Sequence, residues 1–276
     1  MIQKVNTAVE RLLSFEPEDG YYLAFSGGKD SQCVYHLAKM AGVKFDAHYN
    51  LTGIDPPEVY RFIKKNYGDV IIDIPRKEDG SQLTMWDLIL KNKMPPTRIA
   101  RYCCRELKER GGDGRYVITG VRWEESAKRK KNQGLIVVPK QNHSKRLLQS
   151  GDFEENESGG MILVNDNDWS RLMLERCVAR GKVCLNPIID WKEKDVWDFL
   201  NYIGVEHCKV YDDGFKRIGC IGCPMGSKKE RLAAFERWPG YKKLYINSFE
   251  KTLDKTKDNH KTAEDIFKWW VEGVKR

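Results

Sequence analysis

The 276-residue sequence contains no apolar run as long as the roughly 18 residues that a membrane-spanning helix requires. It also lacks an apolar signal segment near its start, where the spacing of residues 1–20 indicates an amphipathic helix. These absences predict a cytoplasmic protein with no membrane partner. Hydrophobic residues make up 41% of the chain, which is enough to form a folded core.

Two chemical patterns are also scarce or missing. The G-x-x-x-x-G-K-[ST] pattern is absent, which excludes a Walker A phosphate loop. His48 and His143 are isolated, and an isolated histidine is more often a surface or core residue than a catalyst. Positive charge is abundant instead: the net charge of +8 suits an anionic partner such as a nucleotide or nucleic acid, although solvated surface lysines produce the same balance.

Short apolar segments alternate with helical patterns over roughly the first 130 residues. The expected strands are 21–26, 44–50, 69–75 and 115–121, and the expected helices are 30–42 and 57–68. This alternation is typical of βαβ units, so it predicts an α/β fold with a mostly parallel sheet.

The alternation stops at residues 130–180. A basic run and an acidic, glycine-rich segment predict an exposed loop or insertion there, rather than an arm that binds a partner. A helical pattern returns at 168–181. Further on, Asp190 and Glu193 have the spacing of a helix capping box.

The chain divides into two predicted domains. Residues 1–205 form the α/β domain, including the insertion, and residues 206–276 form a C-terminal subdomain with a Cys-x-x-Cys motif and helical patterns. Aromatic residues are frequent in the second part, where they would either stack on nucleic acid bases or form a helical core. We expect Trp269 and Trp270 to belong to that core.

A glycine loop, Ser26–Ser31 (SGGKDS), joins the first expected strand to the next helix. Gly27 and Gly28 allow the backbone N–H groups to approach an anion, and the helix N-terminus adds a partial positive charge. Lys29 adds a full charge, the two serine hydroxyls add donors, and Asp30 is a candidate ligand for Mg²⁺. An ordinary strand-to-helix turn uses similar residues, but the six-residue pattern favours a phosphate site.

Four of the 8 cysteines occur in two pairs, Cys103 with Cys104 and Cys220 with Cys223. Four thiolates are what a [4Fe–4S] cluster or a zinc site needs, although adjacent cysteines are unusual for zinc. The alternative is four buried structural thiols. Arginine and lysine residues surround the first pair, and such cations would stabilise an anionic centre or act as helix-surface residues.

Gly120 lies at the end of the fourth expected strand, and Arg122 and Arg129 follow it. In an open α/β sheet, ligands gather at the carboxyl ends of the strands, where the glycine loop would also lie. The two arginines are therefore candidates to bind phosphate or sulfate oxygens.

The SGGKDS loop resembles the PP-loop of the ATP pyrophosphatase, or adenine nucleotide alpha-hydrolase-like, superfamily. Residues 51–63, 120–129 and 186–200 and the two cysteine pairs resemble segments of the phosphoadenylylsulfate (PAPS) reductase family, in the same order along the chain. The resemblance covers most of residues 20–225. It implies a doubly wound sheet with helices on both faces.

The resemblance also implies a site. The loop would bind the β,γ-pyrophosphate of ATP with Mg²⁺, and Lys29, Asp30 and Arg122 would take part in attack of a substrate oxygen on the α-phosphorus. Thr52 and Gly53 would shape the adenine pocket. The four paired cysteines resemble the [4Fe–4S] ligand set of adenylylsulfate-type reductases and related sulfur-transfer enzymes.

Three functions remain within this resemblance. The first is ATP-dependent sulfur transfer, in which sulfur held at the cluster would displace AMP from an adenylated acceptor, such as nucleic acid. The second is reduction of PAPS or adenylylsulfate to release sulfite; the family does this with a cysteine near the C-terminus, and no cysteine follows Cys223 here. The third is a non-catalytic regulator. A sulfur-donor protein and a homodimer are left open.

Overall fold

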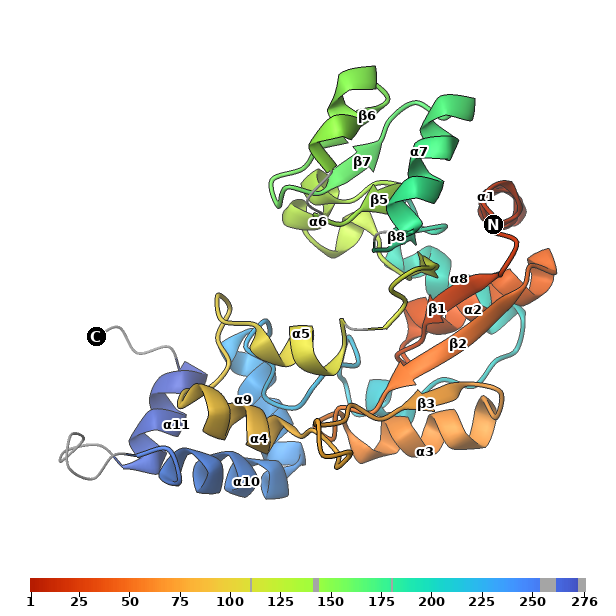
Figure 1. Ribbon diagram of the computed structural model, residues 1–276. Helices are drawn as coiled ribbons and strands as arrows, with labels where there is room; N and C mark the ends of the chain where they lie inside the picture. The colour runs from red at the N-terminus through yellow and green to blue at the C-terminus, as the bar shows by residue number, and fades with distance from the viewer. Residues whose placement is uncertain (110, 141–143, 180, 254–261, 273–276) are drawn as a thin grey trace. The chain divides into compact units, whose positions relative to one another are not determined.

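The computed structural model describes residues 1–109, 111–140, 144–179, 181–253 and 262–272 (Figure 1). By their contacts, these residues form two compact units that are interleaved along the chain. The first unit contains residues 1–49, 66–71 and 111–207, and the second contains residues 50–65, 72–110 and 208–276. The predicted domain boundary after residue 205 stays a prediction.

One 8-stranded sheet is found in the described residues, in the order β3-β2-β1-β4-β8-β5-β7-β6. Neighbours from β2 to β8 in this order are parallel, whereas β5, β7 and β6 are antiparallel additions. The strands are β1 Tyr21–Ala24, β2 Phe45–Asn50, β3 Ile71–Asp73, β4 Tyr116–Ile118, β5 Ile136–Val138, β6 Phe153–Glu155, β7 Met161–Leu163 and β8 Val183–Leu185. The predicted α/β fold is confirmed.

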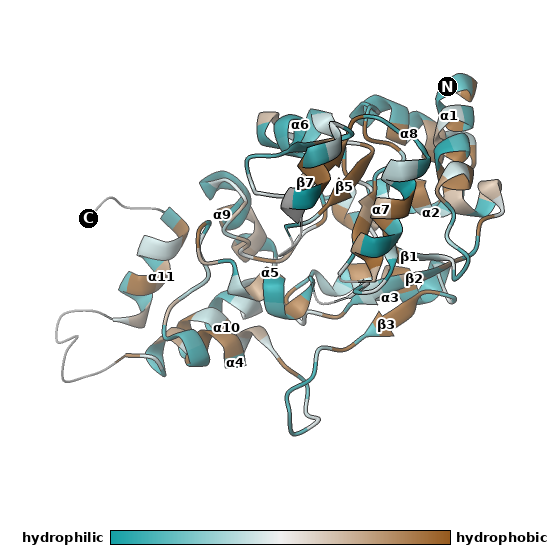
Figure 2. Ribbon diagram, turned by 45° about the horizontal axis from the view of Figure 1, so that its top comes forward, coloured by the Kyte–Doolittle hydropathy of each residue, from teal (hydrophilic) through white to brown (hydrophobic). Residues whose placement is uncertain are grey.

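The sequence predicted an exposed loop or insertion at residues 130–180, and the described residues of this region contain three short strands rather than a loop. The three antiparallel strands are residues 136–138, 153–155 and 161–163. Strands β5 and β7 have buried residues that extend the core, and Figure 2 colours β5 as hydrophobic. Each strand has only three residues, too few for a periodic pattern to show. The polar segment between β6 and β7 is a turn in which Asn156 binds the backbone N–H groups of Ser158 and Gly160.

Helix α2 (Lys29–Ala41) is central to the first unit and packs against α1 (Ile2–Ser14) and α8 (Glu193–Tyr202). It ends at Gly42, whose φ of 70° a residue with a side chain rarely adopts. The other helical segments of this unit are η1 Trp123–Glu125, α6 Ala127–Asn132, η2 Ser144–Ser150 and α7 Asp168–Val178. In the described ranges, every helix of the chain is too short or too polar to cross a membrane.

The second unit is mainly helical, as predicted for the C-terminal region. Its core is an aromatic cluster in which the rings of Tyr245 and Trp270 have centroids 4.7 Å apart. Trp270 is 5% exposed and belongs to the core, as predicted. Trp269 is 39% exposed and does not. The helices are α3 Pro57–Asn66, α4 Met85–Asn92, α5 Tyr102–Leu107, η3 Lys209–Tyr211, α9 Lys228–Arg237, α10 Pro239–Glu250 and α11 Ala263–Glu272.

Candidate functional site

The glycine loop Ser26–Ser31 connects β1 to α2 in the first unit. Gly27 has a φ of 71°, a left-handed conformation that glycine adopts without strain. The Ser31 hydroxyl closes the loop, because it accepts from the Ser26 backbone N–H at 3.2 Å and donates to the Gly28 carbonyl at 2.9 Å. The loop therefore lies at the N-terminus of a 13-residue helix, whose partial positive charge favours an anion.

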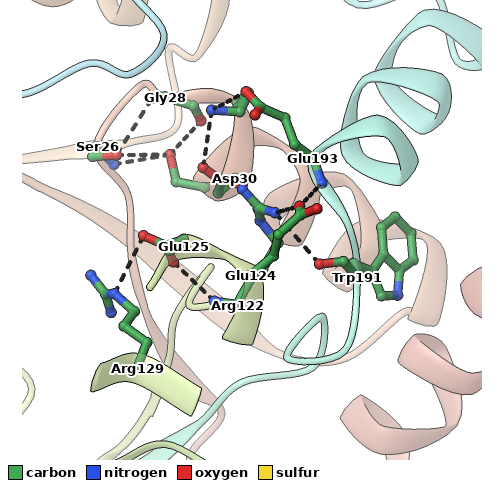
Figure 3. Close-up of polar contacts among 11 residues, drawn as sticks. Ser26, Gly28, Asp30, Arg122, Glu124, Glu125, Arg129, Trp191 and Glu193 are labelled. Atoms are coloured by element: carbon green, nitrogen blue, oxygen red, sulfur yellow. Dashed lines mark hydrogen bonds and ion pairs between the residues drawn. The ribbon is translucent and has the colours of Figure 1, made fainter. Parts of the chain in front are cut away.

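Lys29 is the first residue of this helix and is only 3% exposed. Its ammonium lies 3.4 Å from Glu193 Oε1 and 3.7 Å from Asp30 Oδ2. Burying an ammonium group is costly unless negative charge lies close to it, and the two carboxylates supply that charge (Figure 3). Glu193 is held there because it begins α8, which packs on α2.

Arg122 is also 3% exposed, and it fixes the carboxylate of Asp30. Its Nε donates to Asp30 Oδ1 at 2.7 Å, and its Nη1 donates to Glu124 Oε2 at 3.1 Å and to the Trp191 carbonyl at 3.4 Å (Figure 3). Although burial alone would lower the pKa of Arg122, the charge of Asp30 raises it. The sequence predicted a ligand contact for this arginine; the structure places it in a network of internal ion pairs.

Gly120 lies against the loop from the end of β4. A Cβ atom built on it would be 2.8 Å from both the backbone carbon and the backbone oxygen of Asp30. Real Cβ atoms do not approach backbone so closely, so only glycine fits without displacing Asp30. Arg129 is farther removed: its side chain is 41% exposed and pairs with Glu125 at 3.3 Å.

The sequence analysis missed two carboxylates of this network, Glu124 and Glu193. The expected capping box is also wrong. Helix α8 begins after Lys192, whose backbone N–H bonds to Asp195, while Asp190 pairs with Arg11 at 2.8 Å. Glu193 is thus free of the capping role and reaches Lys29 instead. The one sequence signal for Glu193 is its acidic side chain in the first turn of a helix, where negative charge is favourable.

Thr52 and Gly53, predicted beside the nucleotide, belong to the second unit. The Thr52 hydroxyl donates to Asp55 Oδ2 at 2.8 Å, and its residue is 1% exposed. Thr52 also lines a cavity that is bordered by four cysteines. Gly53 has a φ of 74°, which the turn after β2 requires.

Cys103, Cys104, Cys220 and Cys223 all belong to the second unit and line one cavity of about 20 Å³, the four-thiol cavity. Cys103 and Cys104 lie on α5, and the other two lie on the turn before α9. The remaining walls are mostly apolar and include Tyr245. The fold has therefore gathered the two predicted pairs, which are far apart in the sequence.

Positive charge surrounds these thiols. Contact with Cys103 and the Arg101 guanidinium lower the pKa of Cys104. Burial and the charge of Asp55 raise the pKa of Cys220, and Lys108, which pairs with Asp55 at 3.3 Å, offsets only part of this. Contact with Cys104 and burial likewise raise the pKa of Cys103. Among these three thiols, Cys104 alone is shifted toward the thiolate, the form in which cysteine binds a metal.

The donor set fits a soft metal ion or an iron–sulfur cluster by its chemistry. The arrangement of the side chains is less complete. In the described part of the chain, no group of three or more His, Cys, Asp or Glu side chains is positioned so that it could hold a metal ion. The cavity has room for about one water-sized group, so the thiols would have to move apart to surround a cluster.

Comparisons with known proteins extend over both units. The family model described as phosphoadenosine phosphosulfate reductase domain matches residues 20–225. An uncharacterized protein of Methanocaldococcus jannaschii is 25% identical over 262 residues, covering 89% of this chain and 51% of that protein. A probable FAD synthase of Caenorhabditis briggsae is 22% identical over 218 residues, covering 79% of this chain and 32% of that protein.

A shorter match has a higher sequence identity. An adenosine 5′-phosphosulfate reductase of Neisseria meningitidis serogroup A is 37% identical over 60 residues, covering 22% of this chain and 25% of that protein. The chain thus spans about half or less of the length of these curated relatives. Because the family model matches well over half of the sequence, this chain belongs to the phosphoadenosine phosphosulfate reductase domain family, within the adenine nucleotide alpha-hydrolase-like superfamily.

Proposed function

We propose that the chain binds ATP with Mg²⁺ at the loop Ser26–Ser31 and uses it to adenylate an acceptor for sulfur transfer. The observation that carries this proposal is the buried Lys29 beneath a glycine loop at a helix N-terminus. Backbone N–H groups at a helix N-terminus, together with one ammonium group, suit the two terminal phosphates of a triphosphate. The names of the relatives, a phosphosulfate reductase and a probable FAD synthase, also support an adenine nucleotide.

In the proposed reaction, an acceptor oxygen attacks the α-phosphorus of ATP. The bond from that phosphorus to the bridging oxygen breaks, and pyrophosphate leaves with the electron pair. Lys29 and the N–H groups of the loop would stabilise the charge that develops on the leaving group. A sulfur nucleophile then displaces AMP from the adenylated acceptor. The net charge of +8 supports a nucleic acid as acceptor.

Asp30 and Arg122 would position the reactants. Oδ1 of Asp30 accepts from Arg122 at 2.7 Å, whereas Oδ2 lies 3.7 Å from the Lys29 ammonium, so Oδ2 is the less tightly held oxygen and would face Mg²⁺. Arg122 would hold that carboxylate in place, and Gly120 leaves room for it. Arg129, which is more exposed, remains a candidate for a phosphate contact from the side of the loop.

We further propose that the four thiols hold a [4Fe–4S] cluster, with a zinc ion as the alternative. When bound, such a group would supply a site that holds inorganic sulfur for the transfer. The support is the collection of Cys103, Cys104, Cys220 and Cys223 around one cavity.

Reduction of PAPS or adenylylsulfate is the second candidate. The family description and the reductase relative favour it. ATP-dependent transfer is placed first because the loop around the buried Lys29 suits the terminal phosphates of a triphosphate, which PAPS and adenylylsulfate lack.

The test is purification of the whole chain without oxygen, followed by assays of iron, acid-labile sulfide, zinc and visible absorption. The protein is then incubated separately with ATP, PAPS and adenylylsulfate, with and without nucleic acid, while pyrophosphate and sulfite are measured. We expect pyrophosphate release from ATP when an acceptor is present, and no sulfite release from PAPS or adenylylsulfate. Sulfite from either sulfonucleotide would move the assignment to reduction. Binding of ATP without either product would indicate a regulator and reject both enzymes.

A further inference from the structure

Arg231, on α9, is a buried arginine in which two of the three side-chain nitrogens have no hydrogen-bond partner. Its residue is 8% exposed. Nη1 donates to the Trp270 carbonyl at 2.6 Å, and the guanidinium carbon lies 4.3 Å from the centroid of the Trp270 ring. Nε and Nη2 are closed off from solvent and have no hydrogen-bond partner. Leaving charged donors buried and unsatisfied costs several kcal/mol at most sites, so an explanation is needed.

The charge of Arg231 is also uncompensated. Among the residues that the structure describes, neither Arg231 nor Arg98 forms an ion pair with a carboxylate. The other cations near the thiols do: Lys108 pairs with Asp55, and Arg101 pairs with Glu109 at 3.4 Å. Arg98 donates to the carbonyls of Pro224 and Gly226, on the turn that carries the second cysteine pair. Two like charges therefore converge on this turn.

Arg231 lies directly against that turn. A Cβ built on Gly226 would be 3.3 Å from the Cys223 carbonyl oxygen and 3.6 Å from Cγ of Arg231. The Trp270 ring, on which the guanidinium stacks, would be 3.1 Å from a Cβ on Gly222. Two other polar groups near the turn are already engaged. The Tyr245 hydroxyl donates to the Ile221 carbonyl at 3.2 Å, and Glu230 Oε2, which lies 3.6 Å from the same Gly226 Cβ position, accepts from the Ser227 backbone N–H at 2.7 Å. Cys223 lines the same cavity as Arg231, and its thiol becomes negative when it binds a metal.

We infer that Arg231 is the counter-cation of the four-thiol cavity: its guanidinium balances the negative charge that the thiolates carry once a metal ion or cluster is bound. Four thiolates outweigh the positive charge of a divalent ion or a cluster core, so the filled centre is anionic. The buried charge of Arg231 therefore destabilises the metal-free protein and stabilises the metal-bound protein. This inference rests on the proposed centre.

An alternative partner would be an anion in the neighbouring cavity of about 450 Å³, which Arg231 also lines. The unpartnered nitrogens are buried rather than open to that space, whereas Lys229 lies at its exposed rim. Lys229 therefore serves as the matched control, because it lies on the same helix and borders the same cavity.

The experiment compares the full chain with Arg231→Met, Arg231→Lys and Lys229→Met, each metal-free and loaded with zinc or with iron and sulfide. For Arg231→Met we expect an unfolding midpoint at or above that of wild type in the metal-free form, and metal loss to a chelator about tenfold faster. A reconstituted cluster should also show a more negative reduction potential. Arg231→Lys keeps the charge and should retain metal nearly as wild type does, as should Lys229→Met.

Different failures separate the two proposals. Wild type that takes up neither zinc nor iron would reject the centre and this inference with it. Wild type that holds metal while Arg231→Met holds it equally well would reject the inference alone. Equal destabilisation of both forms by Arg231→Met, or metal loss from Arg231→Lys as fast as from Arg231→Met, would assign the arginine to packing instead. If Arg231→Met does not fold, Arg231→Gln replaces it in every comparison.

Discussion

In the glycine loop, the buried cations Lys29 and Arg122 each lie beside a carboxylate, whereas at the four-thiol cavity the buried cation Arg231 has no anionic partner in the described residues. The loop is thus charge-balanced by the protein itself, so an incoming phosphate must compete with internal ion pairs. The cavity is balanced only if its thiols carry negative charge. Removing a charged side chain at the loop should therefore change how well phosphate competes with the internal ion pairs. Removing Arg231 should change how well the four-thiol cavity retains a bound metal.

The largest effect is expected from Lys29→Ala. Losing the buried ammonium removes the charge that would stabilise the leaving pyrophosphate, and the loss of one such donor typically lowers turnover by about 10²-fold or more. Pyrophosphate release from ATP is the measurement. Lys39→Ala is the control, since Lys39 lies on the same helix but pairs with Asp69 at the surface. Equal turnover in wild type and Lys29→Ala would remove Lys29 from the proposed mechanism.

At the other site, Cys220→Ser should abolish most metal binding, because a serine hydroxyl is a poor ligand for soft metals. Iron, sulfide and zinc contents of the anaerobically purified protein, with the visible spectrum, provide the readout. Cys208→Ser is the matched control: Cys208 lies in the same unit and is 1% exposed, but it does not border the four-thiol cavity. If Cys220→Ser keeps the wild-type metal content, Cys220 is not a ligand.

These two sites also differ in how far the sequence predicts them. The glycine loop is a local pattern, so its conformation and its place between β1 and α2 follow from adjacent residues. Its partner Glu193 depends on the packing of α8 against α2, which no local pattern specifies. Likewise, spacing identified the cysteine pairs, but nothing near Arg231 in the sequence indicates that it lies unpaired beside Cys223.

The fold divides in the same way. The strands β1, β2, β3 and β4 were predicted because each belongs to an apolar run between helical patterns. Strand β8, Val183–Leu185, was missed. Strand β4 is equally short, but it lies within the longer run 115–121, whereas β8 stands alone between two helical patterns. Its place inside the sheet comes from pairing with β4 and β5, which is a tertiary effect.

A medium effect is expected at the contact between Gly120 and the loop. In Gly120→Ala the new Cβ would meet the Asp30 backbone at 2.8 Å, and overpacking against backbone costs about 1–3 kcal/mol. The free energy of unfolding in urea should fall by that amount, together with turnover, because Asp30 is displaced. Gly240→Ala is the control, since no atom lies within 4 Å of its Cβ position. Equal stabilities for the two variants would contradict the close approach.

The smallest effect, opposite in sign, distinguishes competition from ligation at the loop. If Glu193 merely neutralises Lys29, then Glu193→Gln removes a competitor of the phosphates and ATP should bind more tightly. The Glu193 side chain is 49% exposed, and exposed ion pairs contribute up to about 1 kcal/mol, so the gain should be about two- to fivefold. Calorimetric titration with ATP and Mg²⁺ measures it, with Asp198→Asn as a control for charge removal on the same helix. Weaker binding that depends on Mg²⁺ would instead make Glu193 a metal ligand, and the loop would then resemble the thiol cavity in needing its ligand for charge balance.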